Sequence, residues 1–236
     1  MKTKLTSIFL ILILCLSVAA CGQDEAQSVL EEVNEVVSGT SGKTDADDES
    51  EEFVVPDSVL NLSEEDDAKL TGTLTADSYA NEYFGLRINK PEGGTIESIL
   101  DDEGVTDIKS LRQTYEEEIG CIYIRAIDGD YNGVSAMISA VADDQKGKSE
   151  EDRAQERLDL EKSINESMEY ESDLSIETLT IAGEEHPFFV ESSYDDEGII
   201  KKSASACLLK NDFECALTIS APADKFDSMV SCIEKY

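Results

Sequence analysis

Short runs in which apolar and polar residues alternate fill the chain from about residue 71 onward, and they predict β-strands. Glycine, asparagine and aspartate separate neighbouring runs, which is typical of tight turns between antiparallel strands. Phe213, Cys215, Leu217 and Ile219 fall on one face of the last run, because successive side chains alternate across a sheet. The predicted strands span residues 72–79, 83–89, 121–127, 134–142, 174–182, 187–194, 199–209 and 213–221.

Three segments have helical spacing instead. Residues 106–118 place Ile108, Leu111 and Tyr115 on one face behind a Thr106 cap. Ser149 to Asp152 resembles a capping box that opens a helix reaching about Met168, with a sparse apolar stripe. A closing helix from about Pro222 carries the clearest stripe (Phe226, Met229, Val230, Ile233). Strands joined by short turns, with few helices, predict an α+β fold: an antiparallel β-sheet flanked by helices.

Residues 21–70 differ from the rest of the chain in composition. They are rich in aspartate and glutamate, poor in apolar residues, and interrupted by a Ser-Gly-Thr-Ser-Gly segment at residues 38–42. Such a segment cannot bury enough surface to offset its chain entropy, and like charges extend it. We therefore expect an acidic, mostly disordered tether over residues 21–70 and a single α+β domain over residues 71–236.

The chain begins with the features of an export signal. Lys2 and Lys4 precede an apolar run over residues 5–16, and Val18-Ala19-Ala20 leads into Cys21. This arrangement resembles the lipobox of bacterial lipoproteins, with Val18 where leucine is usual. The resemblance implies that residues 1–20 are a signal peptide, that Cys21 carries lipid, and that the protein is held at the extracytoplasmic face of the cell membrane. The alternatives are an ordinary signal peptide with an incidental cysteine, or a membrane span. The run is short for a span, which needs about 20 residues.

Charge narrows the choice of partner. The formal net charge is −34, and removal of Lys2 and Lys4 with the leader would make it −36. Such a surface repels nucleic acid, whose binding requires lysine and arginine to release counterions. Cations and basic peptides are favoured neighbours. Solubility alone also explains an acidic surface.

Four cysteines follow Cys21, and their spacing matches no zinc or redox motif: Cys121, Cys207, Cys215 and Cys232. A three-residue turn centred on Asn211 would place Cys207 opposite Cys215, where a disulfide could form. A two-residue turn of Asn211 and Asp212 would place Cys207 opposite Ala216 and exclude that disulfide. We favour free, buried thiols.

No recognised catalytic motif is present, so we do not expect an enzyme and expect no cofactor. His186 is the only histidine, and its position beside Glu184 and Glu185 near a predicted turn suggests a solvated side chain. Ser203 follows Lys202, but the pair reads as strand surface rather than a Ser-Lys catalytic site.

Asp128, Asp130 and Asn132 form the segment that most resembles a metal site. They match the first half of a calcium-binding EF-hand loop, but the expected glutamate falls at Ser139 and strands flank the segment. A hairpin turn is the ordinary explanation. Weak calcium binding is the minority hypothesis.

Residues 79–93 (Tyr-Ala-Asn-Glu-Tyr-Phe-Gly-Leu-Arg-Ile-Asn-Lys-Pro-Glu-Gly) resemble the opening hairpin of PsbP-like domains in lipoproteins of Gram-positive bacteria. Gly94 stands where tryptophan is usual. The hairpin and helix of residues 199–236 also fit the layout of that family. The resemblance implies an α/β/α sandwich and a binding or assembly module, and it transfers no catalytic residue.

These observations favour a lipid-anchored, extracytoplasmic binding module that is monomeric and contacts a protein, peptide or small ligand through its sheet face or loops. The membrane is reached through the lipid on Cys21. The alternatives are an extracytoplasmic hydrolase with an unrecognised site and an acidic, weakly calcium-binding surface protein.

Overall fold

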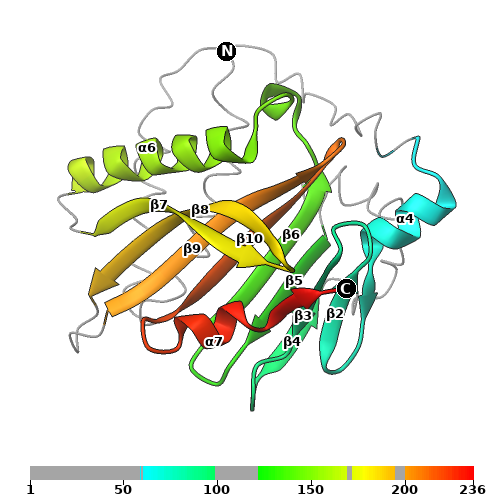
Figure 1. The fold of residues 1–236 in the computed structure, drawn as a ribbon, viewed down its shortest axis with the longest axis horizontal. Coiled ribbons are helices and arrows are strands. Elements are labelled where there is room, and N and C mark those ends of the chain that lie inside the picture. Colours follow the sequence, from blue (N-terminus) through cyan, green and yellow to red (C-terminus); the bar gives the residue numbers. More distant parts are fainter. Residues whose placement is uncertain (1–58, 60, 99–121, 169–171, 195–199) are drawn as a thin grey trace, which may run out of the picture. The chain divides into compact units, whose positions relative to one another are not determined.

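The computed structural model describes residue 59 and residues 61–98, 122–168, 172–194 and 200–236 (Figure 1). The predicted signal peptide, Cys21, most of the predicted tether and the predicted helix at residues 106–118 lie outside these residues. In the described parts of the chain, no helix combines the length and the apolar character that a bilayer span requires.

Seven antiparallel strands form the larger sheet, in the order β4-β5-β6-β10-β9-β8-β7 (Figure 1). Two groups of sequentially paired strands meet where β10 pairs with β6, because β4 to β6 run inward from one edge and β7 to β10 run inward from the other. The strands are β4 (Thr95–Ser98), β5 (Ile122–Ile127), β6 (Gly133–Ala140), β7 (Asp173–Ile181), β8 (Glu184–Tyr194), β9 (Ile200–Lys210) and β10 (Phe213–Pro222).

A four-stranded antiparallel sheet in the order β1-β2-β3-β11 accompanies it. Its strands are β1 (Thr73–Leu74), β2 (Ser78–Asn81), β3 (Leu86–Asn89) and β11 (Ile233–Lys235). The helices are α4 (Glu64–Thr71), the 3-10 turn η2 (Asp143–Gln145), α6 (Glu150–Met168) and α7 (Phe226–Val230). The fold is α+β, with antiparallel sheets and flanking helices, as the sequence predicts.

The core lies on one face of the seven-stranded sheet. The four residues predicted to share a face of β10 are buried there, and side chains of the smaller sheet and α7 belong to the same apolar cluster. Helix α6 packs against β7, β8 and β9 (Figure 1). It meets the opposite face of the sheet, because its buried partners include Glu214, which alternates with the core residues of β10.

The predicted capping box is confirmed at the start of α6. The Ser149 hydroxyl accepts the Asp152 N–H at 3.1 Å, and the Ser149 N–H donates to the Asp152 carboxylate at 3.0 Å. This reciprocal pair satisfies two donors at the helix start. The predicted apolar stripe contributes only in its first half, since Ala154 and Leu158 are buried whereas Met168 is 65% exposed.

The expected domain boundary after residue 70 falls too late. Helix α4 lies within residues 64–71, and the side chains of Leu70 and Val59 are fully buried in the core cluster. Apolar residues spaced within an acidic segment still fold when a neighbouring sheet covers them. Val59 and residues 61–70 of the predicted tether therefore belong to the domain.

The predicted closing helix is also wrong over most of its length. Helix α7 ends at Val230, and residues 233–235 form β11, which pairs with β3. The spacing of Phe226, Met229 and Ile233 fits a helix, but pairing with an open sheet edge outweighs a short helical stripe.

The opening strands are shorter than predicted. The first predicted strand, at residues 72–79, is interrupted by a turn between β1 and β2. The strand predicted at residues 83–89 starts at Leu86, because residues 82–85 form a turn whose last residue, Gly85, has a φ of 69°.

Candidate functional site

Ionisable side chains gather where α6 meets the seven-stranded sheet. We call this group the α6 cluster: Glu150, Arg153, His186, Cys207 and Glu214. The helix supplies the first two, and β8, β9 and β10 supply the others. No other described part of the molecule places a histidine, a cysteine and carboxylates so close together, so the α6 cluster is the strongest chemical candidate.

An ion pair between Arg153 and Glu214 forms the deepest part of the α6 cluster. The two side chains are only 8% and 7% exposed. Arg153 also donates to the Gln145 carbonyl at 3.3 Å, and the Ser139 hydroxyl donates to Glu214 at 3.4 Å. Burial raises the pKa of Glu214, and the opposing effect of Arg153 and Ser139 does not cancel it.

Glu150 occupies a gap between β8 and β9. The β8–β9 ladder begins at the pair Phe189 and Ser205, and the same register would place Pro187 opposite Cys207. Because proline has no N–H, the ladder ends there. One carboxylate oxygen of Glu150 accepts the Leu209 N–H at 2.9 Å, and the other contacts Nδ1 of His186 at 2.8 Å. A helix side chain thus replaces a missing strand partner.

His186 is therefore not the solvated residue that the sequence suggests. Its side chain is 13% exposed and is held by Glu150. The turn before it consists of Ala182 and Gly183, both with positive φ, and β8 begins at Glu184. Residue 186 lies in the strand, where the N-terminal end of α6 covers it.

The register of the last hairpin settles the disulfide question. Cys207 lies opposite Ala216 and Cys215 opposite Leu208, as the two-residue turn predicts. The two thiols are free, as predicted, and lie on opposite faces of the sheet; Cys215 is buried as predicted, whereas Cys207 is half-buried. Burial raises the pKa of Cys207 to about 11. The thiol is therefore protonated near neutral pH and is a poor nucleophile.

Ser203 and Lys202 do not form a catalytic pair. Neighbouring residues of a strand point to opposite faces of the sheet. The Lys202 ammonium lies 2.8 Å from Glu177 and 4.9 Å from the centre of the Phe226 ring. The Lys202 side chain is thus engaged on the core face of the sheet, away from Ser203, and it is not the exposed strand surface that the sequence suggests.

The groups of the α6 cluster are engaged with one another and with the backbone. Together they hold α6 on the sheet, because the helix offers only a short apolar stripe for packing. Oriented carboxylates and a histidine can move protons, whereas nucleophilic attack by Cys207 would need a thiolate, which its raised pKa disfavours. The described contacts of the cluster therefore fix the N-terminal half of α6 to the sheet.

The predicted calcium loop folds as a hairpin turn. One oxygen of the Asp128 carboxylate accepts the Asp130 N–H at 2.8 Å and the Asn132 N–H at 3.0 Å, and the Asn132 amide also donates to the carboxylate. The Asp130 carboxylate lies 3.3 Å from the Lys225 ammonium. Within the described residues, no group of three or more histidine, cysteine, aspartate or glutamate side chains is placed to hold a metal. Calcium binding stays a hypothesis.

Replacement of Asp128 by alanine is expected to lower the free energy of unfolding by about 1–2 kcal/mol at pH 7, because the turn loses several hydrogen bonds. Partial burial raises the pKa of Asp128, but the bonds from Asn132 and the backbone amides outweigh it and hold that pKa below its usual value. The stabilisation is thus present above the unfolded pKa and is lost as the pH falls through the folded pKa.

Urea unfolding at pH 7 and at acidic pH measures this difference. Asp130→Ala is the control, since it removes an exposed ion pair and is expected to cost less than about 0.5 kcal/mol. Equal effects of the two substitutions at pH 7 would contradict the role of Asp128. Calorimetry with millimolar calcium on the same proteins tests the calcium hypothesis.

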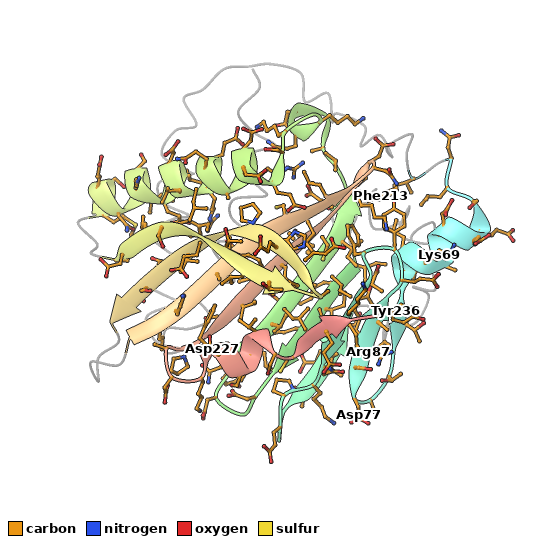
Figure 2. The ribbon with its side chains drawn as sticks, viewed as in Figure 1. Lys69, Asp77, Arg87, Phe213, Asp227 and Tyr236 are labelled. Atoms are coloured by element: carbon orange, nitrogen blue, oxygen red, sulfur yellow. The ribbon has the colours of Figure 1, made fainter. Side chains whose placement is uncertain are left out.

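A shallow hollow of about 320 Å³ lies beside α4. Figure 2 shows Lys69 on α4 and Tyr236 at the C-terminal end, which both line it. The Lys69 ammonium lies 2.6 Å from Glu65, so its charge is paired within α4. The hollow is small and carries charges of both signs, which makes it a weak ligand site.

Strand β7 lies at one edge of the seven-stranded sheet. It pairs with β8 over all nine of its residues, from Asp173↔Ser192 to Ile181↔Glu184. Its other side faces no strand among the described residues. An unpaired edge of this length is a surface on which another chain can add a strand.

Comparison with known proteins gives only distant structural similarity. No family model matches the chain, and no curated protein matches it. The structure is similar to that of cyanobacterial PsbP from Synechocystis sp. PCC 6803, with 14% identity, a TM-score of 0.35, and coverage of 70% of this chain and 96% of that one. A protein from Bacteroides thetaiotaomicron is also similar, with 13% identity, a TM-score of 0.31, and coverage of 69% of this chain and 49% of that one. Function therefore has to be argued from the residues of this chain.

Proposed function

We propose that this protein is a lipid-anchored, extracytoplasmic binding module without catalytic activity. The observation that carries the proposal is the leader that ends in Val18-Ala19-Ala20-Cys21, ahead of an acidic segment and a compact domain. Acylation of Cys21 would hold the domain at the membrane, and two acyl chains bind far more firmly than one. The anchor sets where the domain works and leaves the domain free to bind.

The chemistry of the described domain supports a binding role over a hydrolase. Cys207 has a raised pKa, His186 is held by Glu150, and Lys202 is paired with Glu177. A hydrolase of the serine or cysteine type needs a nucleophile, a base and an orienting group in contact. In the described residues the candidate groups stabilise the fold instead.

Metabolic labelling with an alkyne fatty acid tests the anchor. We expect label on the wild-type protein and none on Cys21→Ala, because the lipid would be attached to that thiol. Cys15→Ala is the matched control, since the leader that contains it would be removed, and it should keep the label. Unlabelled wild type, or label that survives in Cys21→Ala, would overturn the anchor.

Chemical crosslinking in intact cells tests the binding role. The anchored protein is expected to capture a partner that the unanchored Cys21→Ala form, released from the membrane, captures less often. Hydrolysis of a substrate panel by the purified protein, abolished by His186→Ala, would replace the binding module with the hydrolase.

A further inference from the structure

The backbone amides on the outer side of β7 can be assigned from the hairpin that precedes β8. In a two-residue hairpin the residues that flank the turn form a hydrogen-bonded pair, here Ile181 and Glu184. Pairs then alternate, so Thr178 and Pro187 form a non-hydrogen-bonded pair, which suits a proline without an N–H. The amides that point outward therefore belong to four residues: Leu174, Ile176, Thr178 and Thr180.

These four residues have no backbone hydrogen bond on their outer side anywhere in the described chain. Their side chains include two exposed threonines and Ile176, which is 39% exposed. Four donors and four acceptors thus lie along one line, as they would in a sheet that lacks its next strand.

The other described sheet edges do not offer such a line. Strands β1, β4 and β11 have two, four and three residues. Natural proteins protect long edges with proline, lysine or a bulge. Strand β7 contains no proline and no lysine, and its ladder with β8 is continuous. Only Asp173 and Glu177 interrupt its uncharged sequence.

The charges around β7 indicate which sign of charge a partner would carry. The edge carries Asp173 and Glu177, and the adjoining hairpin carries Glu184 and Glu185. Lys202 neutralises Glu177, so the acidic excess near this edge comes from Asp173, Glu184 and Glu185, in a chain whose net charge is −34. A second copy and the chain's own acidic N-terminal segment would both be repelled, whereas a basic segment would be attracted.

We propose that the outer edge of β7, which no described strand covers, receives an extended, basic segment of another protein as an eighth strand of the sheet. This inference rests on the proposed binding function and names its surface and the class of its partner. Backbone hydrogen bonds to the outward amides and carbonyls would supply most of the affinity, and lysine or arginine side chains of the partner would face the acidic rim.

The test uses the full chain, solubilised in mild detergent, and a nine-residue peptide of alternating lysine and valine with blocked ends. Thr178→Pro removes one outward N–H and leaves the β7–β8 ladder intact, because that N–H does not face β8. We expect it to weaken binding about tenfold or more, whereas the matched Thr178→Ala changes binding less than about threefold. The same peptide with glutamate in place of lysine should not bind.

A second measurement removes the same bonds from the peptide. N-methylation of alternate peptide amides should abolish binding to the wild type, so the test stands even if Thr178→Pro unfolds. Failure of the wild type to bind the basic peptide, or equal binding by both Thr178 variants and the wild type, would overturn the β7 site. A dimer that Thr178→Pro dissociates would replace the basic partner with a second copy.

The two proposals can fail separately. Loss of the fatty-acid label without loss of peptide binding would overturn the anchor and leave the β7 site standing. If the Thr178→Pro variant still crosslinks to the same partner as the wild type, the proposed binding function would stand, but the assignment of that binding to β7 would be overturned.

Discussion

Replacement of Arg153 by methionine is expected to lower the free energy of unfolding by about 3–5 kcal/mol at pH 7, because it leaves a buried carboxylate without its partner. The Glu214 side chain is only 7% exposed, and the remaining contact of its carboxylate is the Ser139 hydroxyl at 3.4 Å. Urea unfolding at pH 7 measures the loss. Arg125→Met is the matched control, because the Arg125 guanidinium lies over the exposed Tyr131 ring rather than in a buried ion pair.

Two further measurements, unfolding at acidic pH and unfolding of a double variant, separate the effect of the Arg153 charge from the effect of its packing. The pKa of Glu214 is raised, so the folded protein binds this proton at a higher pH than the unfolded chain, and stability falls as the pH rises through that window. The deficit of Arg153→Met should therefore shrink in acid. The double variant Arg153→Met with Glu214→Leu should approach the wild type, as apolar pairs often do. A double variant as unstable as Arg153→Met alone would show that Arg153 stabilises the fold through the packing of its side chain and not through its charge.

Much of the larger sheet could be predicted from the sequence. Alternating runs bounded by Gly183, and by Asn211 with Asp212, predict hairpins, and the structure has both turns within a residue or two of the predicted place. Local chemistry decides these elements, because a two-residue turn with positive φ fixes the register of both flanking strands. The same local logic holds for the Ser149 cap of α6.

The α6 cluster could not be predicted, because it depends on contacts far apart in the sequence. Glu150 and Leu209 are separated by 59 residues, and Arg153 and Glu214 by 61. Two signals pointed to it. Glu214 is a charged residue within an apolar strand, and Pro187 removes an N–H in the middle of the sheet. Both require a partner from another element, but neither says which element supplies it.

The resemblance at residues 79–93 has a structural explanation at Asn81. This side chain is fully buried at the end of β2. Its amide nitrogen donates to the Leu70 carbonyl and to the Tyr79 hydroxyl, both at 2.8 Å, and its oxygen accepts the Phe84 N–H at 2.9 Å. Asn81 therefore joins the end of α4 to the turn before β3. The motif maintains the fold, and nothing in its geometry assigns it to a ligand.

Asn81→Ala is expected to lower the free energy of unfolding by about 3 kcal/mol or more, because the Leu70 carbonyl and the Phe84 N–H lose this partner, the Tyr79 hydroxyl loses one of its two bonds, and an unsatisfied buried group costs about 1–3 kcal/mol. Tyr79→Phe should cost less, about 1 kcal/mol, because it removes the hydroxyl together with its bond to the Thr71 carbonyl at 3.0 Å but leaves the bonds of Asn81 to Leu70 and Phe84 in place. Urea unfolding measures both, and Asn89→Ala on β3 is the control for the same chemical change at a half-buried position.

The pair of substitutions also tests whether these groups act as one network. Because Asn81 donates directly to Tyr79, the double variant Asn81→Ala with Tyr79→Phe should lose less stability than the sum of the two single losses. Strict additivity would mean that the two side chains stabilise α4 and the turn independently. A loss for Asn81→Ala no greater than that for Asn89→Ala would show that the buried amide does not hold α4 against the smaller sheet, and the start of the domain would then depend on the apolar contacts of Leu70 and Val59 alone.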